Sequence, residues 1–154
     1  MVYLAKGNII VRDSQVGDFE GIKDNIIPAI IEEIKASHGG NLEDEIASCV
    51  SKSGGVYTGL YGDKVICMFG DIPDSEGGAC IWMITSNEAQ NIKKTFVIFS
   101  KFFIKFFRSQ YNKIYNYIDV RYDSCIKWME KCGAKFSEPE PYGKEGLLFK
   151  RWEV

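Results

Sequence analysis

The segment ACIWMIT, residues 79–85, restricts the possible folds of this chain more than any other feature. It is almost continuously apolar, which is typical of a central strand covered on both faces of its sheet. The polar residues TSNEAQ (85–90) overlap its end, and a long amphipathic segment comes next. This succession predicts a strand, a turn and a helix as one unit of a mixed α/β structure.

The amphipathic segment predicts one long helix from about residue 88 to residue 110. Its core-facing side chains recur at the 4-3-4-3 spacing of one helical face, and they are Ile92, Phe96, Phe99, Phe103 and Phe106. Basic side chains follow another face of the same helix, and they are Lys94, Lys101, Lys105 and Arg108. Lysines interrupt the most apolar stretch (95–107), which is too short to cross a bilayer core of about 30 Å. We therefore expect a buried amphipathic helix and no membrane span.

Capping residues define the helices nearer the N-terminus. Isoleucines at helical spacing predict a helix over residues 24–37, with Asp24 as its cap and Pro28 in its first turn. Gly39, with its neighbours His38 and Gly40, should end that helix. Asn41 then caps a second helix, because Asp44 follows three residues later in a capping-box position.

The remaining segments predict strands and one further helix. Gly62 and Asp63 indicate a tight hairpin turn within residues 55–72. The later elements are a strand over 113–120, a helix over 122–132, and two last strands in AKF (134–136) and GLLFKRW (146–152). With a first strand at 8–12, the order is β-α-α-β-β-β-α-β-α-β-β. We predict the α/β (α+β) class, with a mixed sheet and helices on both faces, in a single domain over residues 1–154.

Composition excludes several classes of protein. The net charge is −2, which gives no overall signal of nucleic-acid binding. The charge is unevenly distributed, because no Asp or Glu lies between Ala89 and Ile118, whereas the N-terminal third is acidic. Five cysteines without a CxxC pair, and one histidine, argue against a zinc site, so no metal is expected. We interpret the cysteines as reduced core residues of a cytosolic protein. The opening residues lack the apolar run of a secretory signal peptide.

The predicted element order resembles that of the GNAT acetyltransferases, and one segment strengthens the resemblance. GNAT sequences often end their last helix with a pattern like N-x-x-A-x-x-L-Y-E-K-x-G-F, and YDSCIKWMEKCGAKF (122–136) can be aligned with it. Glu130, Lys131 and Gly133 match that pattern. Met129 stands where the family has a tyrosine that often re-protonates the coenzyme A thiolate, and a thioether cannot transfer a proton. Tyr122 is the residue that could replace this proton donor, and aromatic packing is the alternative interpretation.

The resemblance also implies where acetyl-CoA would bind. GNAT enzymes place Q/R-x-x-G-x-G/A before the long helix, so that backbone N–H groups face the pyrophosphate. Here Gln90 fits the pattern, but Lys93 and Thr95 occupy the glycine positions. The residues that the resemblance assigns to cofactor binding are Ile84, Thr85, Ser86, Gln90, Lys93, Lys94 and Thr95. In the alternative interpretation, the lysines belong to a solvated first turn, and the residues at 85–87 cap the helix.

A narrower resemblance is carried by WMITS before a basic aromatic helix and by K-x-G-A-x-F (131–136) near the end. These features resemble the GNAT-like proteins of short-tailed bacteriophages, of the internal virion protein A type. The resemblance implies a phage protein in the host cytoplasm or in the virion, with a phage or host protein as its partner. A virion, assembly or host-interaction role is then the first hypothesis.

Two alternative functions stay open. An active N-acetyltransferase would move acetyl from acetyl-CoA to a primary amine, with Asp71, Glu76 or Asp119 as candidate bases unless these are surface turn residues. A nucleic-acid-associated protein would use the basic helix 88–110, whose charged face is otherwise an ordinary solvated one.

Overall fold

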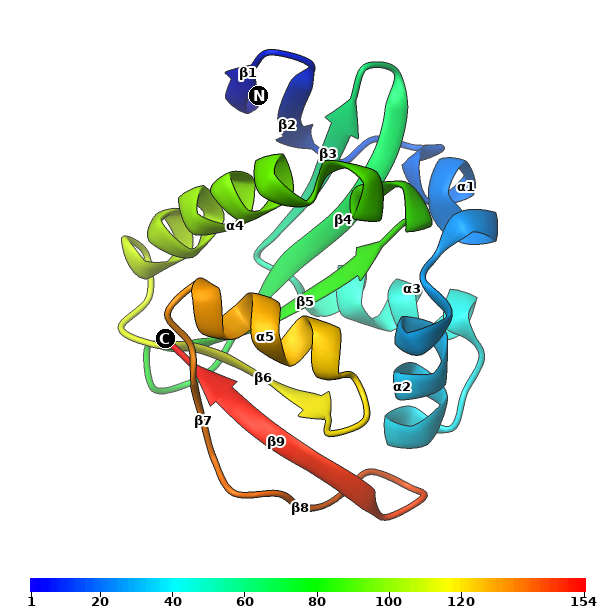
Figure 1. The fold of residues 1–154 in the computed structure, drawn as a ribbon, viewed down its shortest axis with the longest axis vertical. Helices are drawn as coiled ribbons and strands as arrows, with labels where there is room; N and C mark the ends of the chain where they lie inside the picture. Colours follow the sequence, from blue (N-terminus) through cyan, green and yellow to red (C-terminus); the bar gives the residue numbers. More distant parts are fainter.

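The computed structural model describes residues 1–154 as one nine-stranded sheet with helices on both faces (Figure 1). The strands are β1 (Val2–Lys6), β2 (Ile9–Asp13), β3 (Gly55–Tyr61), β4 (Lys64–Pro73), β5 (Ala79–Thr85), β6 (Ile114–Asp119), β7 (Lys135–Phe136), β8 (Glu140–Tyr142) and β9 (Leu147–Glu153). The α-helices are α1 (Asp18–Ile22), α2 (Pro28–His38), α3 (Leu42–Lys52), α4 (Lys93–Arg108) and α5 (Asp123–Lys131). Two 3₁₀ helices, η1 (Lys23–Asn25) and η2 (Asn87–Ile92), precede α2 and α4.

The sheet order is β1-β2-β3-β4-β5-β6-β9-β7, and β8 also pairs with β9. Neighbouring strands are antiparallel except β5 and β6, which are parallel and joined by α4. The predicted mixed α/β fold is therefore confirmed. The sequence-based order lacked β1, α1 and β8, which are short elements of three to five residues with weak periodicity.

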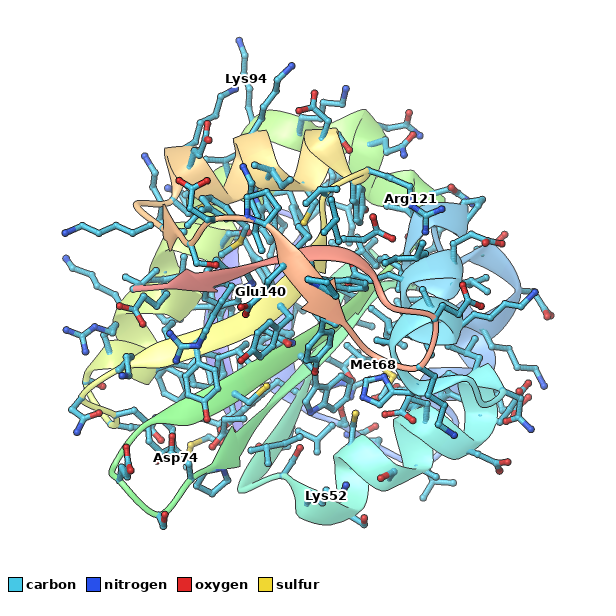
Figure 2. All side chains as sticks on the ribbon, turned by 90° about the horizontal axis from the view of Figure 1, so that it is seen from below. Lys52, Met68, Asp74, Lys94, Arg121 and Glu140 are labelled. Atoms are coloured by element: carbon cyan, nitrogen blue, oxygen red, sulfur yellow. The ribbon has the colours of Figure 1, made fainter.

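Two hydrophobic clusters lie on opposite faces of the sheet. Figure 2 shows α4 and α5 on one side of the sheet and α3 on the other. The larger cluster joins the sheet to α4 and α5 and contains Phe69 and Phe99. The smaller cluster joins the other face to α1, α2 and α3 and contains Trp82 and Ile84. β5 contributes to both clusters, which is why its sequence is apolar on both faces.

The predicted N-cap of α3 and the predicted end of α2 are confirmed. The Oδ1 atom of Asn41 accepts a hydrogen bond from the backbone N–H of Asp44 at 2.8 Å. Gly39 follows α2 in the left-handed conformation, with φ at 71°. Asp24 does not cap α2, because the chain passes through η1 before the helix starts at Pro28. The prediction of one helix from residue 24 was therefore wrong at its beginning.

Helix α4 packs its aromatic side chains against the sheet. Phe96, Phe99 and Phe103 are buried, as their spacing predicted. Phe107 is 1% exposed, whereas Phe106 is only partly buried, so the inward face at the C-terminal end is rotated from the predicted one. The helix begins at Lys93, because residues 87–92 form the 3₁₀ turn η2 where the sequence predicted α-helix. None of the helices combines the length and the apolar character of a transmembrane span.

Candidate functional site

β5 and β6 separate at the centre of the sheet. Their parallel pairing consists of Ala79 with Ile114 and Cys80 with Tyr115, at the first residues of both strands. β5 and β4 stay paired along the whole of β5. The C-terminal half of β5 therefore faces a gap, and α4 and α5 cover this gap on one face of the sheet (Figure 1).

A cavity of about 540 Å³ lies in this gap. Its walls are mostly apolar and come from β5, β6, α4 and α5, with Met83, Phe103 and Trp128 among them. The indole Nε1–H of Trp128 is buried without a hydrogen-bond partner. A largely apolar cavity with a few oriented polar groups is the usual form of a small-molecule site.

The free backbone of β5 supplies some of these polar groups. Odd-numbered residues of β5 direct their backbone groups away from β4, because hydrogen-bonding directions alternate along a strand. The carbonyl of Ile81 accepts from Asn116 Nδ2 at 2.7 Å, and the carbonyl of Thr85 accepts from the N–H of Ile27 at 3.0 Å. Between these two, the N–H and C=O of Met83 face the gap. They can hydrogen-bond an extended ligand that contains an amide.

Glu33 of α2 is the one acidic residue that lines the cavity. Its Oε2 atom accepts a hydrogen bond from the backbone N–H of Asp119 at 3.2 Å. Burial is the main cause that raises the pKa of Glu33 to about 7, and the charge of nearby Asp119 adds to it. The hydrogen bond from the backbone N–H of Asp119 lowers the pKa and only partly offsets this rise. The guanidinium of Arg121 holds the pKa of Asp119 below its usual value. Two neighbouring carboxyls thus have separated pKa values, a pattern that is typical of acid–base sites.

Tyr122, the predicted replacement proton donor, lines the same cavity immediately before α5. Burial is the main cause that raises the pKa of its hydroxyl, and the Cys125 thiol and Glu33 add to it. The hydroxyl therefore keeps its proton at neutral pH. Met129, which the sequence resemblance aligns with the family tyrosine, is 4% exposed and packs in the larger cluster.

The predicted cofactor residues separate into two groups. Thr85, Gln90 and Lys93 line the cavity, with Lys93 at the first turn of α4. Lys94 is exposed and points away from the molecule (Figure 2), and Thr95 is also exposed.

Ile84 and Ser86 lie at the end of β5 without lining the cavity. The side chain of Ile84 belongs to the smaller cluster on the other face of the sheet. Ser86 is 2% exposed, forms a β-bridge with Ile26, and its Oγ has no hydrogen-bond partner.

The candidate bases proposed from the sequence differ from the carboxyl group in the cavity. Asp71 and Asp119 are 2% and 3% exposed, so the alternative interpretation of them as surface turn residues was wrong. The carboxylate of Asp71 accepts hydrogen bonds from the hydroxyl of Tyr111 and from the backbone N–H of Gly55. Asp71 does not line the cavity. Sequence reasoning missed Glu33, although its position three residues after the buried Ile30 would place it on the inward side of α2.

Comparisons with solved structures identify the fold. An acetyltransferase of the GNAT family from Bacillus anthracis superposes with a TM-score of 0.72 at 14% identity, covering 100% of this chain and 98% of the other. Ard1 from Thermoplasma volcanium gives 0.71 at 13% identity, covering 96% and 97%. A Bacillus subtilis acetyltransferase in complex with CoA gives 0.67 at 11% identity, covering 97% and 98%. The chain therefore has the GNAT fold.

Comparison by sequence gives a family. The family model described as "Bacteriophage T7, probable scaffold protein Gp13" matches residues 64–140, which is half of the chain. The matched segment contains β4, β5, α4, β6 and α5, which supply most of the cavity wall, whereas α2 and β9 lie outside the matched segment. No curated protein matches the chain.

Proposed function

Because this chain belongs to the family of the bacteriophage T7 probable scaffold protein Gp13, we propose that it acts in phage assembly. In this proposal it is a virion or assembly component that is built on the GNAT fold and works in the host cytoplasm before packaging. The family match is the observation that carries the proposal. Two differences from GNAT enzymes support it, namely the side chains of Lys93 and Thr95 at the glycine positions and the buried Met129 at the tyrosine position.

Mass spectrometry of purified particles tests the assembly role. We expect the chain in defined copy number in assembly intermediates, in mature virions, or in both, because an assembly protein must be bound to the particle that it builds. A phage-encoded cytoplasmic enzyme of similar abundance serves as the control for contamination. Absence from both kinds of particle would contradict the proposal.

A second candidate function, N-acetyl transfer, is favoured by Glu33 in the cavity. The apolar slot fits the pantetheine arm of acetyl-CoA, because the peptide groups of Met83 and the unpaired Nε1–H of Trp128 match its amides. Lys93 and the N-terminus of α4 would hold the phosphates through charge, without the glycine cradle. When bound, acetyl-CoA supplies a thioester that a neutral primary amine can attack.

Residues that line the cavity would accept and donate the protons that this reaction transfers. Glu33, with a pKa near neutrality, can accept the proton that an ammonium group must lose before attack. Tyr122 holds a proton at Oη on the same cavity wall and can supply it to the departing sulfur. Asp119 keeps its charge through Arg121 and fixes Glu33 by its backbone N–H.

Thermal unfolding with acetyl-CoA tests this second candidate. A micromolar dissociation constant would stabilise the fold by about 4 kcal/mol at a thousandfold excess of ligand. Lys93→Glu should remove that stabilisation, because this residue lines the cavity. Lys94→Glu is the matched control and should keep most of it, because Lys94 points outward.

Acetyl transfer to spermidine then tests the role of Glu33. The reaction rate is measured from the release of the free thiol of coenzyme A. The rate should rise with pH through about 7, as the carboxyl loses its proton, and Glu33→Gln should abolish that rise. No change in the melting temperature at millimolar acetyl-CoA would overturn the enzymatic proposal.

A further inference from the structure

The outer side of α4 carries a straight basic stripe. Its side chains repeat at the 4-3-4-3 spacing of one helical face, and they are Lys94, Ile98, Lys101, Lys105 and Arg108. All five residues are exposed, and Ile98 is 57% exposed in the middle of the charges. No acidic side chain forms an ion pair with any of the four basic residues. We call this set the α4 stripe.

The opposite face of the molecule carries the complementary features. On α3, Glu43, Ala47 and Val50 follow one outward line, and Asp44 lies beside it. Glu43 and Asp44 form no ion pair, and Val50 is 41% exposed. We call these four residues the α3 stripe.

Other charges on the α2 and α3 side do not remove its acidic character. Glu32 of α2 is exposed nearby, and basic Lys35 and Lys52 lie in the last turns of α2 and α3. The charge of Lys23 in η1 also interacts with Glu43, although the ion pair of Lys23 is with Glu20. Figure 2 shows α3 and the outward-pointing Lys94 of α4 on opposite sides of the sheet, so the two stripes lie on helices that cover opposite faces of the molecule.

We propose that the α4 stripe of one molecule binds the α3 stripe of a second copy, so that molecules associate head to tail. Each stripe joins charged side chains of one sign, none of them in an ion pair, to an exposed branched aliphatic side chain, and the two signs are opposite. A contact between different surfaces of identical chains leaves one stripe free on each end, so it repeats until a ring closes or a filament grows.

The occupant is a second copy rather than a nucleic acid, because the same chain carries a matching surface of opposite charge. The net charge of −2 also opposes a general attraction to polyanions. The biological meaning of this contact rests on the proposed assembly role, whereas the contact itself can be measured on the purified protein.

Sedimentation of the full chain at several concentrations tests the contact. At 0.1 M ionic strength, where the screening length is about 10 Å, the average mass should rise with concentration. At 1 M, where that length is about 3 Å, it should fall toward that of the monomer. A mass that stays monomeric at every concentration and at both salt levels would overturn the proposal.

Charge reversal identifies the two surfaces. Lys101→Glu with Lys105→Glu on α4, or Glu43→Lys with Asp44→Lys on α3, should each weaken association by about tenfold or more, because like charges then face each other. All four substitutions in one chain restore opposite signs and should restore association. An equimolar mixture of the two double variants should also associate. Lys6→Glu, at an exposed position on β1, is the control and should change nothing.

Four results separate the ways in which the proposal can fail. Melting temperatures of all variants show whether a loss of association is a loss of folding, and absence of rescue in the fourfold variant overturns the assigned surfaces. Duplex DNA binding that weakens linearly in log–log plots against salt, by a chain that stays monomeric alone, would replace this proposal with a nucleic-acid surface. Self-association of a chain that is absent from phage particles would keep the contact and reject the assembly role.

Discussion

Phe69→Ala is expected to lower the free energy of unfolding by about 3–5 kcal/mol, the range for removing a buried aromatic side chain. Phe69 is fully buried on β4, where the sheet meets α4. Its ring lies 4.4 Å from that of Phe103 between centroids, and rings of Tyr57, Phe99 and Phe107 surround it within 6.1 Å. Several neighbours would have to move to fill the space, so the cost should fall in the upper part of that range.

Urea unfolding, monitored through tryptophan fluorescence, measures this loss of free energy. Leu148→Ala is the control, because Leu148 is 48% exposed on β9 and its truncation should change the free energy by about 0.5 kcal/mol or less. A loss below about 1 kcal/mol for Phe69→Ala would show that the α4 side of the core is loosely packed.

Asp18→Asn is expected to cost about 3 kcal/mol, because it leaves a largely buried cation without its partner. Asp18 is 7% exposed and accepts two hydrogen bonds from the guanidinium of Arg12, at 2.8 and 3.0 Å. It also accepts from the hydroxyl of Thr58 and from the N–H of Gln15. Asparagine keeps the shape of the side chain but removes the charge that compensates Arg12.

The same site predicts a dependence of stability on pH. Burial acts to raise the pKa of Asp18, but the hydrogen bonds from Arg12, Gln15 and Thr58 outweigh it and lower the pKa. The carboxylate therefore stabilises the fold fully above its unfolded pKa of about 3.9, and that contribution is lost as the pH falls through the lower folded value. Urea unfolding between about pH 2 and pH 7 should show this loss in the native chain.

Two variants test this interpretation of the acid sensitivity. In Asp18→Asn, the part of the stability loss at low pH that comes from this site should disappear. Asp13→Asn is the matched control, because Asp13 is exposed and pairs with the N-terminal amine, a surface pair that contributes about 1 kcal/mol or less. If both variants lose the same free energy of unfolding relative to the native chain, the assigned role of burial is contradicted.

Strongly local signals explain the elements that sequence reasoning predicted well. Asn41, Gly39 and Gly62 act within a few residues of themselves, through a side-chain cap or a positive φ that glycine tolerates. The apolar run of β5 was recognisable because both clusters of the core bury it. The short strands β1 and β8 were missed because their pairing depends on partners supplied by the rest of the sheet.

The site was predictable only in outline. The junction between β5 and α4 was found, but the orientation of each residue there depends on how the helix starts. Residues turn by about 120° each in a 3₁₀ helix and by about 100° in an α-helix, so η2 changes the direction in which the first side chains of α4 point. This change helps to place Lys93 at the cavity and Lys94 on the outside. Glu33 comes from a distant segment, and no local pattern joins it to Asp119.

By itself, the sequence determined the GNAT-like order of strands and helices, the double burial of β5, and the basic face of α4. These properties follow from periodicity and capping, which act over a few residues. Only the tertiary structure decided that β5 and β6 separate over a cavity, that Glu33 lines it, and that α3 and α4, with their stripes, cover opposite faces of the sheet. Those arrangements depend on packing between segments far apart in the chain, which the order of residues alone does not display.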